Sequence, residues 1–437
     1  MNEEYRVQGV GITEIAEQFG TPLFVYDGDV LGGRTDAVRA ALHERLEIFY
    51  SLKANPNVSV CAVLRLHGAR AEVSSLTELR TALHAGVVPH DIVFLGPGKS
   101  EEELEACLDE GILAIVCESF GELAVIDRLA RARGVRAPVT LRVNPSFSIK
   151  GSGLTMGGRA RQFGIDEDQL TADPGLAARH PHVRLTGIHV YMGTRILDAA
   201  TIAANTARIF DLSERLANVL GFDLELVDVG GGLGVAYFDG ERDLDLDELA
   251  ASVNPLLAAF AGRHPRTRMI MEVGRYLTAE AGTYVARVRY VKDSYGERFA
   301  VADGGTNHHM AAVGIGSFVK RNFPLRILDR VAEPATEDWT VTGPLCTPND
   351  TLGKKVALPP VREGDLVGVL RSGAYGPSAS PVLFLGHGHP AEVLVLAGRP
   401  HLVRAADRVD DHLRLQRLVV DGGAAHDRTT RSGGTAG

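Results

Sequence analysis

The chain has 437 residues, with 46 Lys and Arg against 55 Asp and Glu, and a formal net charge of −9 at pH 7. Hydrophobic residues make up 45% and charged residues 23% of the chain, an ordinary globular composition that excludes a disordered or fibrous protein. The acidic balance and the absence of a Lys/Arg-rich block argue against a nucleic-acid or anionic-membrane surface, so we expect a small-molecule partner.

No targeting or membrane segment is visible in the sequence. The first residues lack the basic and apolar stretches of a secretion signal, and no apolar run approaches the ~20 residues that span a bilayer. The four cysteines have neither zinc-ligand nor disulfide-framework spacing. We therefore expect a cytoplasmic protein with free thiols, no membrane contact and no structural metal.

The first part of the chain alternates between short β-forming runs and helical segments. The apolar runs are Glu47–Ala54, Arg70–Ser75, Asp91–Pro97, Leu113–Ser119, Pro138–Pro145, Leu185–Gly193, Leu224–Gly232 and Arg268–Arg275. Segments with helical spacing include Ser75–Ala85, Ser100–Glu110, Phe120–Arg133, Ala199–Leu220 and Leu246–Gly262. This alternation predicts a parallel (β/α)8 barrel of the TIM type over residues 25–275. A doubly wound sheet is the alternative, and the uninterrupted repetition weighs against it.

After Arg275 the pattern changes to the alternating residues of antiparallel strands. The predicted strands are Thr283–Val291, Phe299–Asp303, Thr340–Leu345, Asp365–Leu370 and Glu392–Ala397. They predict an all-β domain, a β-sandwich or β-barrel, made of residues 276–420 together with residues 1–24. The fold class is thus α/β plus all-β, with a discontinuous second domain. Residues 421–437 lack periodicity and are predicted to form a disordered tail.

Polar side chains fall where the predicted barrel strands end, which is the face that carries the active site in barrel enzymes. They are Lys53, Glu72, Arg142, His189, the turn Gly230-Gly231-Gly232, Glu272 and Arg275. We infer a functional site at this face.

Each of these groups also has a structural interpretation. Lys53 follows an apolar strand, where desolvation would favour the neutral amine that forms a Schiff base, but a strand-end lysine can also extend to solvent. The glycine turn exposes backbone N–H groups to an anion, and a tight barrel turn needs glycine equally. Glu272 could form an ion pair with Arg275.

Together these residues describe a pyridoxal phosphate site. Lys53 would hold the aldehyde, the glycine turn and Arg275 the phosphate, and Glu272 the ring nitrogen. A protonated ring nitrogen makes the electron sink that stabilises a carbanion at an amino-acid α-carbon. His189 would stack on the ring, with Thr194 near the phosphate.

Several stretches match one enzyme family in order. They are Tyr50–Asn55, Glu72–Ser75 with Glu78, Leu141–Val143, His189–Thr194, Asp228–Gly232, Glu272–Arg275, Gly343–Cys346 and Gly373–Gly376. With them the sequence resembles the fold-type III pyridoxal-phosphate decarboxylases, the group of diaminopimelate, ornithine and arginine decarboxylases. The resemblance covers most of the chain.

The resemblance implies a head-to-tail homodimer whose two active sites each borrow residues from the partner. Cys346 would cross to the partner's site and protonate the carbanion after CO2 leaves; the alternative for Cys346 is an ordinary buried thiol. Asp350 would cross with it, and Tyr375 would reach the phosphate. For Glu72 and Glu78 the alternative role is stabilisation of the following helix N-terminus. The further cofactor-binding positions implied by the family are Glu72, Arg142 and Gly274.

The chain departs from the diaminopimelate enzymes around the distal end of the substrate. Thr347 stands where an acidic residue is usual, and Asp303–Ala311 lacks the family's arginine for the distal carboxylate. Each lost charged partner is worth ~1.5–3 kcal/mol, so diaminopimelate is a doubtful substrate. The segments around Asn307 and over Ser380–His389 resemble the branch that includes decarboxylases of carrier-protein-tethered glutamate. The predicted substrate-binding residues are Asp350, Asn307, His308 and Tyr375.

Three function classes therefore remain open. A decarboxylase is favoured, acting on a free amino acid such as diaminopimelate, a basic or an acidic amino acid, or on a carrier-bound aminoacyl group. A fold-type III racemase would want an arginine at the ring nitrogen and a tyrosine as second base. A non-enzymatic homologue is disfavoured by the retention of Lys53, Cys346 and Glu272. The histidines His308, His309, His387 and His389 lack carboxylate or cysteine partners at ligand spacing, so we expect no metal site there.

Overall fold

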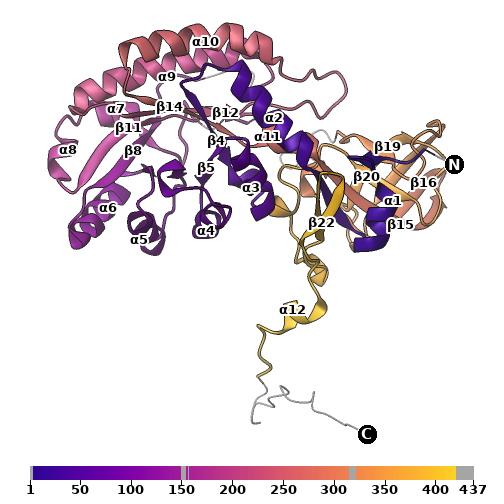
Figure 1. Cartoon of the computed structure of the whole chain (residues 1–437). Helices are drawn as coiled ribbons and strands as arrows, with labels where there is room; N and C mark the ends of the chain where they lie inside the picture. Colours follow the sequence, from indigo (N-terminus) through magenta and orange to yellow (C-terminus); the bar gives the residue numbers. More distant parts are fainter. Residues whose placement is uncertain (1–2, 149–153, 156, 314–320, 420–437) are drawn as a thin grey trace.

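The computed structural model describes residues 3–148, 154–155, 157–313 and 321–419. Figure 1 shows a helix-ringed barrel beside a second, mainly β body drawn in orange and yellow. The tail predicted at residues 421–437 lies outside the described residues. None of the described helices is both long and apolar enough to cross a membrane.

All eight predicted barrel strands are present and form one closed parallel sheet. They are β4 (Leu46–Ser51), β5 (Arg70–Val73), β6 (Ile92–Phe94), β7 (Ala114–Cys117), β8 (Ala137–Asn144), β11 (Val183–His189), β13 (Leu226–Gly231) and β14 (Arg268–Val273). Each pairs in parallel with the next, and β14 returns to pair with β4. The predicted (β/α)8 barrel is confirmed.

Helices cover the outside of this sheet. They are α2 (Gly28–Ala41), α3 (Val58–Leu66), α4 (Leu76–His84), α5 (Glu101–Glu110), α6 (Phe120–Arg133), α7 (Glu167–Thr171), α8 (Leu176–Arg179), α9 (Ala199–Leu220), α10 (Leu246–Arg263) and α11 (Arg275–Thr278). Local sequence sets their ends: α5 begins at a Ser100–Glu103 capping box and ends at Gly111 in the left-handed conformation.

The barrel begins with a helix rather than a strand. Helix α2 precedes β4 and packs against both α3 and α10. The last strand, β14, is followed only by the short α11, so α2 occupies the place in the ring beside β14 and β4. The second body therefore contains chain segments from both sides of the barrel: β3 (Leu23–Asp27) precedes α2, and β15 (Gly282–Ser294) follows α11.

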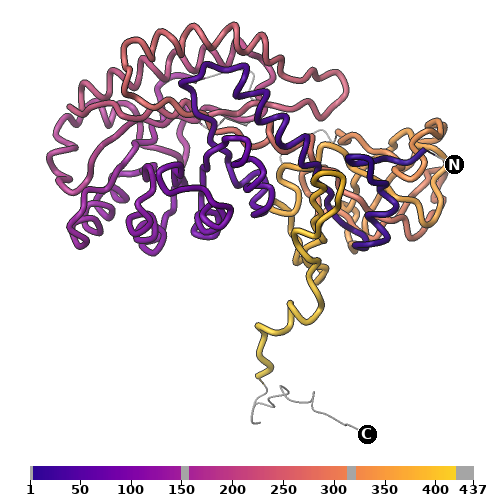
Figure 2. The backbone as a smooth tube through the Cα atoms, in the orientation of Figure 1, coloured from indigo at the N-terminus to yellow at the C-terminus, as the bar shows by residue number. Residues whose placement is uncertain are grey.

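The second body is built on a sheet that joins both ends of the chain. Its path runs β19 (Thr351–Leu358), β18 (Glu337–Thr342), β16 (Glu297–Ala302), β15 (Gly282–Ser294), β3 (Leu23–Asp27), β21 (Ala391–Leu396) and β22 (Arg399–Arg404), with β20 (Leu366–Val369) beside β15 and β17 (Leu325–Ile327) beside β20. In Figure 2 the indigo N-terminal segment runs among the orange and yellow strands.

Strand β3 lies between two strands that follow the barrel in the sequence. It pairs antiparallel with β15 and parallel with β21. Residues 25–27 therefore pair in this sheet, although the sequence places the start of the barrel at residue 25; the domain boundaries themselves stay a prediction. The sequence patterns did not reveal β17, β19 and β22, nor the small elements β1 (Arg6–Val7), β2 (Val10–Gly11), α1 (Ile12–Phe19) and α12 (Val409–Leu413).

Candidate active site

The predicted polar residues of the barrel lie together at the carboxyl ends of its strands. Lys53 lies in the turn η1 (Leu52–Ala54) that follows β4, Glu72 lies in β5, and Arg142 lies in β8. His189 ends β11, and Glu272 lies near the end of β14. Parallel strands bring these positions to one end of the barrel.

Lys53 forms an ion pair at the mouth of the barrel. Its Nζ donates to Oε2 of Glu72 at 2.9 Å; 38% of the Lys53 side chain is exposed, while the Glu72 side chain is fully buried. The hydroxyl of Ser74 donates to the other Glu72 oxygen at 2.9 Å. Burial disfavours the charged amine, but Glu72 and Glu272 outweigh burial and raise the Lys53 pKa well above its usual value. The structure therefore contradicts the expectation that desolvation would make this amine neutral.

Two buried carboxyl groups, those of Glu272 and Asp228, lie close to the imidazole of His189. His189 Nε2 donates to Oε1 of Glu272 at 2.9 Å and lies 4.0 Å from Oδ2 of Asp228. Burial opposes ionisation of Glu272, yet the adjacent His189 lowers its pKa to about 2. Burial and the Glu272 charge raise the pKa of Asp228 well above its usual value. The shifts thus favour the ionised form of Glu272 and the protonated form of Asp228.

This cluster contains three buried polar atoms without a hydrogen-bond partner among the described residues. They are His189 Nδ1, Asp228 Oδ2 and Glu272 Oε2. Buried polar atoms are rarely left unpaired, so the cluster is arranged to meet a bound group. Asp228 had no role predicted from the sequence; its place two residues before the glycine turn is the signal that could have found it.

The glycine turn packs against the neighbouring strand. A Cβ on Gly231 would lie 1.7 Å from the Glu272 carbonyl oxygen, and Gly230 and Gly232 have φ of 67° and 88°, so this turn requires glycine. The N–H of Gly230 donates to Oδ1 of Asp228 at 2.8 Å. Of the three N–H groups predicted to face an anion, that of Gly230 is therefore already used.

Arg275, at the start of α11, is held between two tyrosines. Its Nη1 donates to the Tyr237 hydroxyl at 3.1 Å, and its guanidinium carbon lies 4.6 Å from the centre of the Tyr375 ring. The backbone N–H of Tyr375 donates to the carbonyl of Ala54 at 2.7 Å, directly beside Lys53. The Arg275 Nε is buried and unpaired among the described residues. Tyr237 was missed by sequence analysis.

Gly274 and Thr194 are two further positions that were predicted to bind the cofactor. Gly274 packs against the Lys53 strand, because a Cβ there would lie 3.0 Å from that of Ala54. Thr194 lies in β12 (Gly193–Thr194), which pairs with β9 (Leu154–Thr155). Gly274 directly follows β14, and Thr194 lies five residues after the end of β11.

Arg142 is buried in an ion pair that sequence analysis did not anticipate. Its Nη1 donates to Oε1 of Glu118 at 2.9 Å, and its guanidinium carbon lies 4.6 Å from the centre of the Phe163 ring. The Gly96 N–H donates to the same Glu118 oxygen at 2.9 Å. Glu118 thus ties together the ends of three neighbouring strands. Glu118 could have been identified from the sequence by its place at the end of the predicted strand Leu113–Ser119.

The predicted residues of the second body divide into exposed and buried positions. Cys346 is exposed, whereas the other three cysteines are buried. Asp350 is buried and accepts hydrogen bonds from the backbone N–H groups of Thr306 and Leu345, both at 2.7 Å. Among the described residues no hydrogen bond or ion pair links Cys346 or Asp350 to Lys53. Whether they meet substrate stays a prediction.

Asn307, His308 and His309 are buried close to the Tyr375 segment. The Tyr284 hydroxyl lies 3.1 Å from His308 Nδ1, and His308 Nε2 donates to the carbonyl of Gly388 at 3.0 Å. His309 Nε2 lies 2.7 Å from the hydroxyl of Ser372, three residues before Tyr375. Burial lowers the pKa of His308 to about 4 and that of His309 to about 3. Both imidazoles are uncharged at neutral pH.

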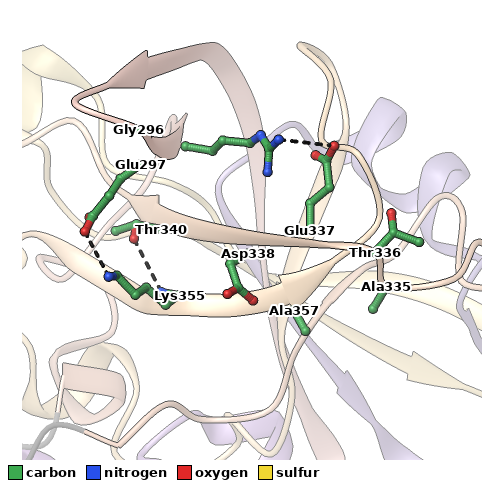
Figure 3. Close-up of a pocket in the computed structure, with 10 residues that line it drawn as sticks. Gly296, Glu297, Ala335, Thr336, Glu337, Asp338, Thr340, Lys355 and Ala357 are labelled. Carbon is green, nitrogen blue, oxygen red and sulfur yellow. Dashed lines mark hydrogen bonds and ion pairs between the residues drawn. The ribbon is translucent and has the colours of Figure 1, made fainter.

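A hollow of about 540 Å³ lies elsewhere, at the starts of β16 and β18 (Figure 3). Four of its five charged side chains pair with each other: Lys355 with Glu297 at 2.9 Å and Arg298 with Glu337 at 3.7 Å. Cys346 follows the opposite end of β18, and none of the predicted site residues lines the hollow. We therefore place the site at the barrel mouth.

The residues at the mouth fit pyridoxal phosphate. Glu272 and His189 have unpaired buried atoms, Lys53 supplies an amine at the barrel mouth, and Arg275 offers an unpaired N–H. One imidazole and two carboxylates with atoms within 4.8 Å can also hold a metal ion. The amine and the anion-binding groups of the same mouth are better explained by an aldehyde that carries a phosphate.

Comparison with known proteins agrees with this chemistry. Residues 31–279 match the family model described as pyridoxal-dependent decarboxylase, pyridoxal binding domain. The chain is 39% identical over 409 residues to the L-glutamyl-(BtrI acyl-carrier protein) decarboxylase of Niallia circulans, covering 93% of this chain and 96% of that protein. It is 31% identical over 413 residues to the diaminopimelate decarboxylase of Aquifex aeolicus, covering 93% of this chain and 95% of that protein.

A solved structure extends the likeness to the fold. The diaminopimelate decarboxylase of Helicobacter pylori, complexed with L-lysine, superimposes with a TM-score of 0.83 at 28% sequence identity. The match covers 92% of this chain and 98% of that chain. Both domains are therefore shared with that protein.

Proposed function

Because the chain belongs to the pyridoxal-dependent decarboxylase family, we propose that it removes the α-carboxyl group of a glutamyl-type amino acid tethered to a carrier protein. The chemical class is that of the family: a carboxy-lyase that uses pyridoxal phosphate and acts on an amino acid. The carrier-bound substrate, the roles of the site residues and the dimer are the proposal.

The barrel residues divide the work of the reaction. Pyridoxal phosphate, when bound, supplies an electron sink for the pair of electrons that CO2 leaves behind. Lys53 is the attachment residue for its aldehyde, and Glu72 holds the Lys53 amine at the barrel mouth. Glu272, ionised by its contact with His189, holds the proton on the ring nitrogen. The thiol of Cys346 then delivers a proton to the α-carbon.

The substrate assignment rests on the neutral imidazoles of His308 and His309. In the family that this chain resembles, the segment after the Asp-Gly motif holds the distal carboxylate through an arginine. Between Asp303 and Val313 the only basic side chains are these two histidines, which are neutral at pH 7. A distal carboxylate would meet no cation on this segment, which disfavours diaminopimelate.

A tethered glutamyl group fits this segment for a chemical reason. The α-carboxyl group must be free if it is to leave as CO2, so the tether must use the side-chain carboxyl group. The distal end of such a substrate carries no charge. An uncharged distal group needs no ion-pair partner and suits buried neutral histidines.

We also propose that the protein works as a cytoplasmic homodimer. Cys346 is exposed in the single chain, which suits a residue that completes the site of a second copy. All four cysteines are free, which suits a reducing compartment.

The experiment compares substrates with one purified enzyme. Protein loaded with pyridoxal phosphate is incubated with side-chain-linked glutamyl carrier protein, free glutamate, diaminopimelate, ornithine and arginine, and CO2 release is measured. We expect release from the carrier-bound substrate at least ~100-fold faster than from any free amino acid, since tethering supplies binding energy remote from the reacting carbon. Faster release from diaminopimelate would overturn the substrate assignment in favour of the family's other activity.

A further inference from the structure

Arg275 is the residue proposed to bind the cofactor phosphate, and only some of its guanidinium N–H groups have a hydrogen-bond partner. A guanidinium group has five N–H donors in a rigid planar fork and binds an oxyanion best through two parallel hydrogen bonds. Nη1 donates to the Tyr237 hydroxyl at 3.1 Å. Nε is buried and has no partner in the part of the chain that the structure describes.

The Tyr237 contact therefore selects one edge of the fork. With Nη1 occupied, the edge formed by Nε and Nη2 is left for an anion. The Tyr375 ring packs against the guanidinium plane, with its centre 4.6 Å from the Arg275 Cζ atom, and so limits tilting. The hydrogen bond from Nη1 to the Tyr237 hydroxyl opposes rotation within that plane.

Tyr237 is itself held firmly. Its ring stacks on that of Phe323, with centres 4.3 Å apart and planes 18° apart. Its backbone N–H donates to Oε2 of Glu241 at 3.1 Å, and Arg371 donates to the carbonyl of Ala236 just before it. Only 4% of Tyr237 is exposed. The hydroxyl has a fixed position before any ligand arrives.

From this geometry we propose that Tyr237 is a positioning residue, which presents the Nε and Nη2 edge of Arg275 to the phosphate of the cofactor. The inference rests on the proposed role of Arg275 and adds a residue that does not itself touch the phosphate. Its consequence is specific: Tyr237 matters for a phosphorylated ligand and not for the same ligand without phosphate.

The test measures binding rather than catalysis. Apoenzyme is titrated with pyridoxal 5'-phosphate and, separately, with pyridoxal, and the dissociation constants are obtained from absorbance. Tyr237→Phe keeps the stacked ring and removes only the hydroxyl. We expect it to weaken binding of the phosphorylated aldehyde about tenfold and to leave pyridoxal binding unchanged.

The chain offers a matched control in a second arginine–tyrosine pair. Arg34 Nη1 donates to the Tyr276 hydroxyl at 3.0 Å, and its guanidinium carbon lies 4.8 Å from the centre of that ring. Tyr276→Phe should alter binding of neither ligand. An equal loss for both ligands in Tyr237→Phe, or no loss for either, overturns the inference.

A double variant distinguishes the positioning role of Tyr237 from the phosphate-binding role of Arg275. Arg275→Met should abolish the preference for the phosphorylated ligand, and adding Tyr237→Phe to it should cause no further loss, because the two residues act through one contact. Additive losses overturn the positioning role of Tyr237 alone. If Arg275→Met keeps the full phosphate preference, the assignment of Arg275 itself is wrong.

Discussion

The Nε2 atom of His189 lies 2.9 Å from Oε1 of Glu272, and both side chains are completely buried. The imidazole keeps the Glu272 carboxylate ionised in a place where burial alone would neutralise it. The second carboxylate oxygen, Oε2, has no partner among the described residues. The contact thus leaves one oxygen of an ionised carboxylate without a partner, as the proposed contact with the ring nitrogen of the cofactor requires.

Glu272→Gln is therefore expected to separate cofactor binding from turnover. The amide keeps the size of the side chain and its hydrogen-bonding capacity, but it cannot hold a proton on the ring nitrogen. We expect the variant to retain the cofactor and to lose at least ~100-fold in kcat, because the missing charge matters most in the transition state. Steady-state CO2 release and cofactor absorbance together measure both effects.

Glu47→Gln is the matched control for this loss. Glu47 lies at the start of β4, at the other end of the barrel, where it pairs with Arg70 at 3.0 Å. Its loss should change stability slightly and turnover little. If Glu272→Gln turned over like wild type, the proposed role of Glu272 would be refuted.

Lys53 is expected to be the sole lysine that carries the cofactor. Borohydride reduction of the loaded enzyme, followed by peptide mapping, should place the pyridoxyl group on Lys53, because its side chain is partly exposed at the mouth of the barrel. Lys99 is the informative comparison, since it lies nearby after β6 but its Nζ donates to Gly96 O, Val116 O and Glu122 Oε1 at 2.6–2.7 Å. A label on Lys99, or on any lysine other than Lys53, would end this assignment.

The buried histidines predict how stability depends on pH. An unfolded histidine takes up a proton below pH 6.5, whereas folded His309 does so only near its lowered pKa of about 3. Between these values the unfolded state binds more protons, so the free energy of unfolding falls as the pH falls through this window. His309 alone should account for roughly 2 kcal/mol of lost stability between pH 7.5 and pH 5.

Chemical denaturation of His309→Gln measures this contribution. The variant has no titrating group at the position, so its free energy of unfolding should fall less steeply with pH than that of wild type. His90→Gln removes an exposed histidine and should keep the wild-type slope. Parallel curves for wild type and His309→Gln would show that His309 does not titrate as its burial requires.

The barrel was predictable from the sequence because its strands are buried on both faces. Such strands read as short continuous apolar runs, and the helices between them have clear periodicity and caps. The ends of α6 and α9 follow directly from this pattern. Short or edge strands of the second body, such as β17, carry too little periodicity to be recognised.

The residues of the candidate site could be predicted from the sequence, but the contacts between their side chains could not. Position at strand ends identifies Lys53 and Glu272, since barrel topology alone brings these ends together. Which carboxylate meets which cation depends on side-chain packing, so the Glu118–Arg142 and His189–Glu272 contacts were not foreseen. The direction of the Lys53 pKa shift was predicted wrongly because it depends on Glu72 being within 2.9 Å.

A shared active site predicts complementation between two inactive variants. We expect Lys53 from one subunit to work with Cys346 from its partner, so Lys53→Ala and Cys346→Ala proteins should each be inactive. In a mixed dimer one site contains both substitutions and the other contains neither. After subunit exchange with random pairing, about half of the dimers are mixed and each has one intact site, so activity should recover to about one quarter of wild type. Exchange is verified separately with differently tagged subunits. If the subunits exchange and activity stays at the level of the single variants, Cys346 does not act across the interface.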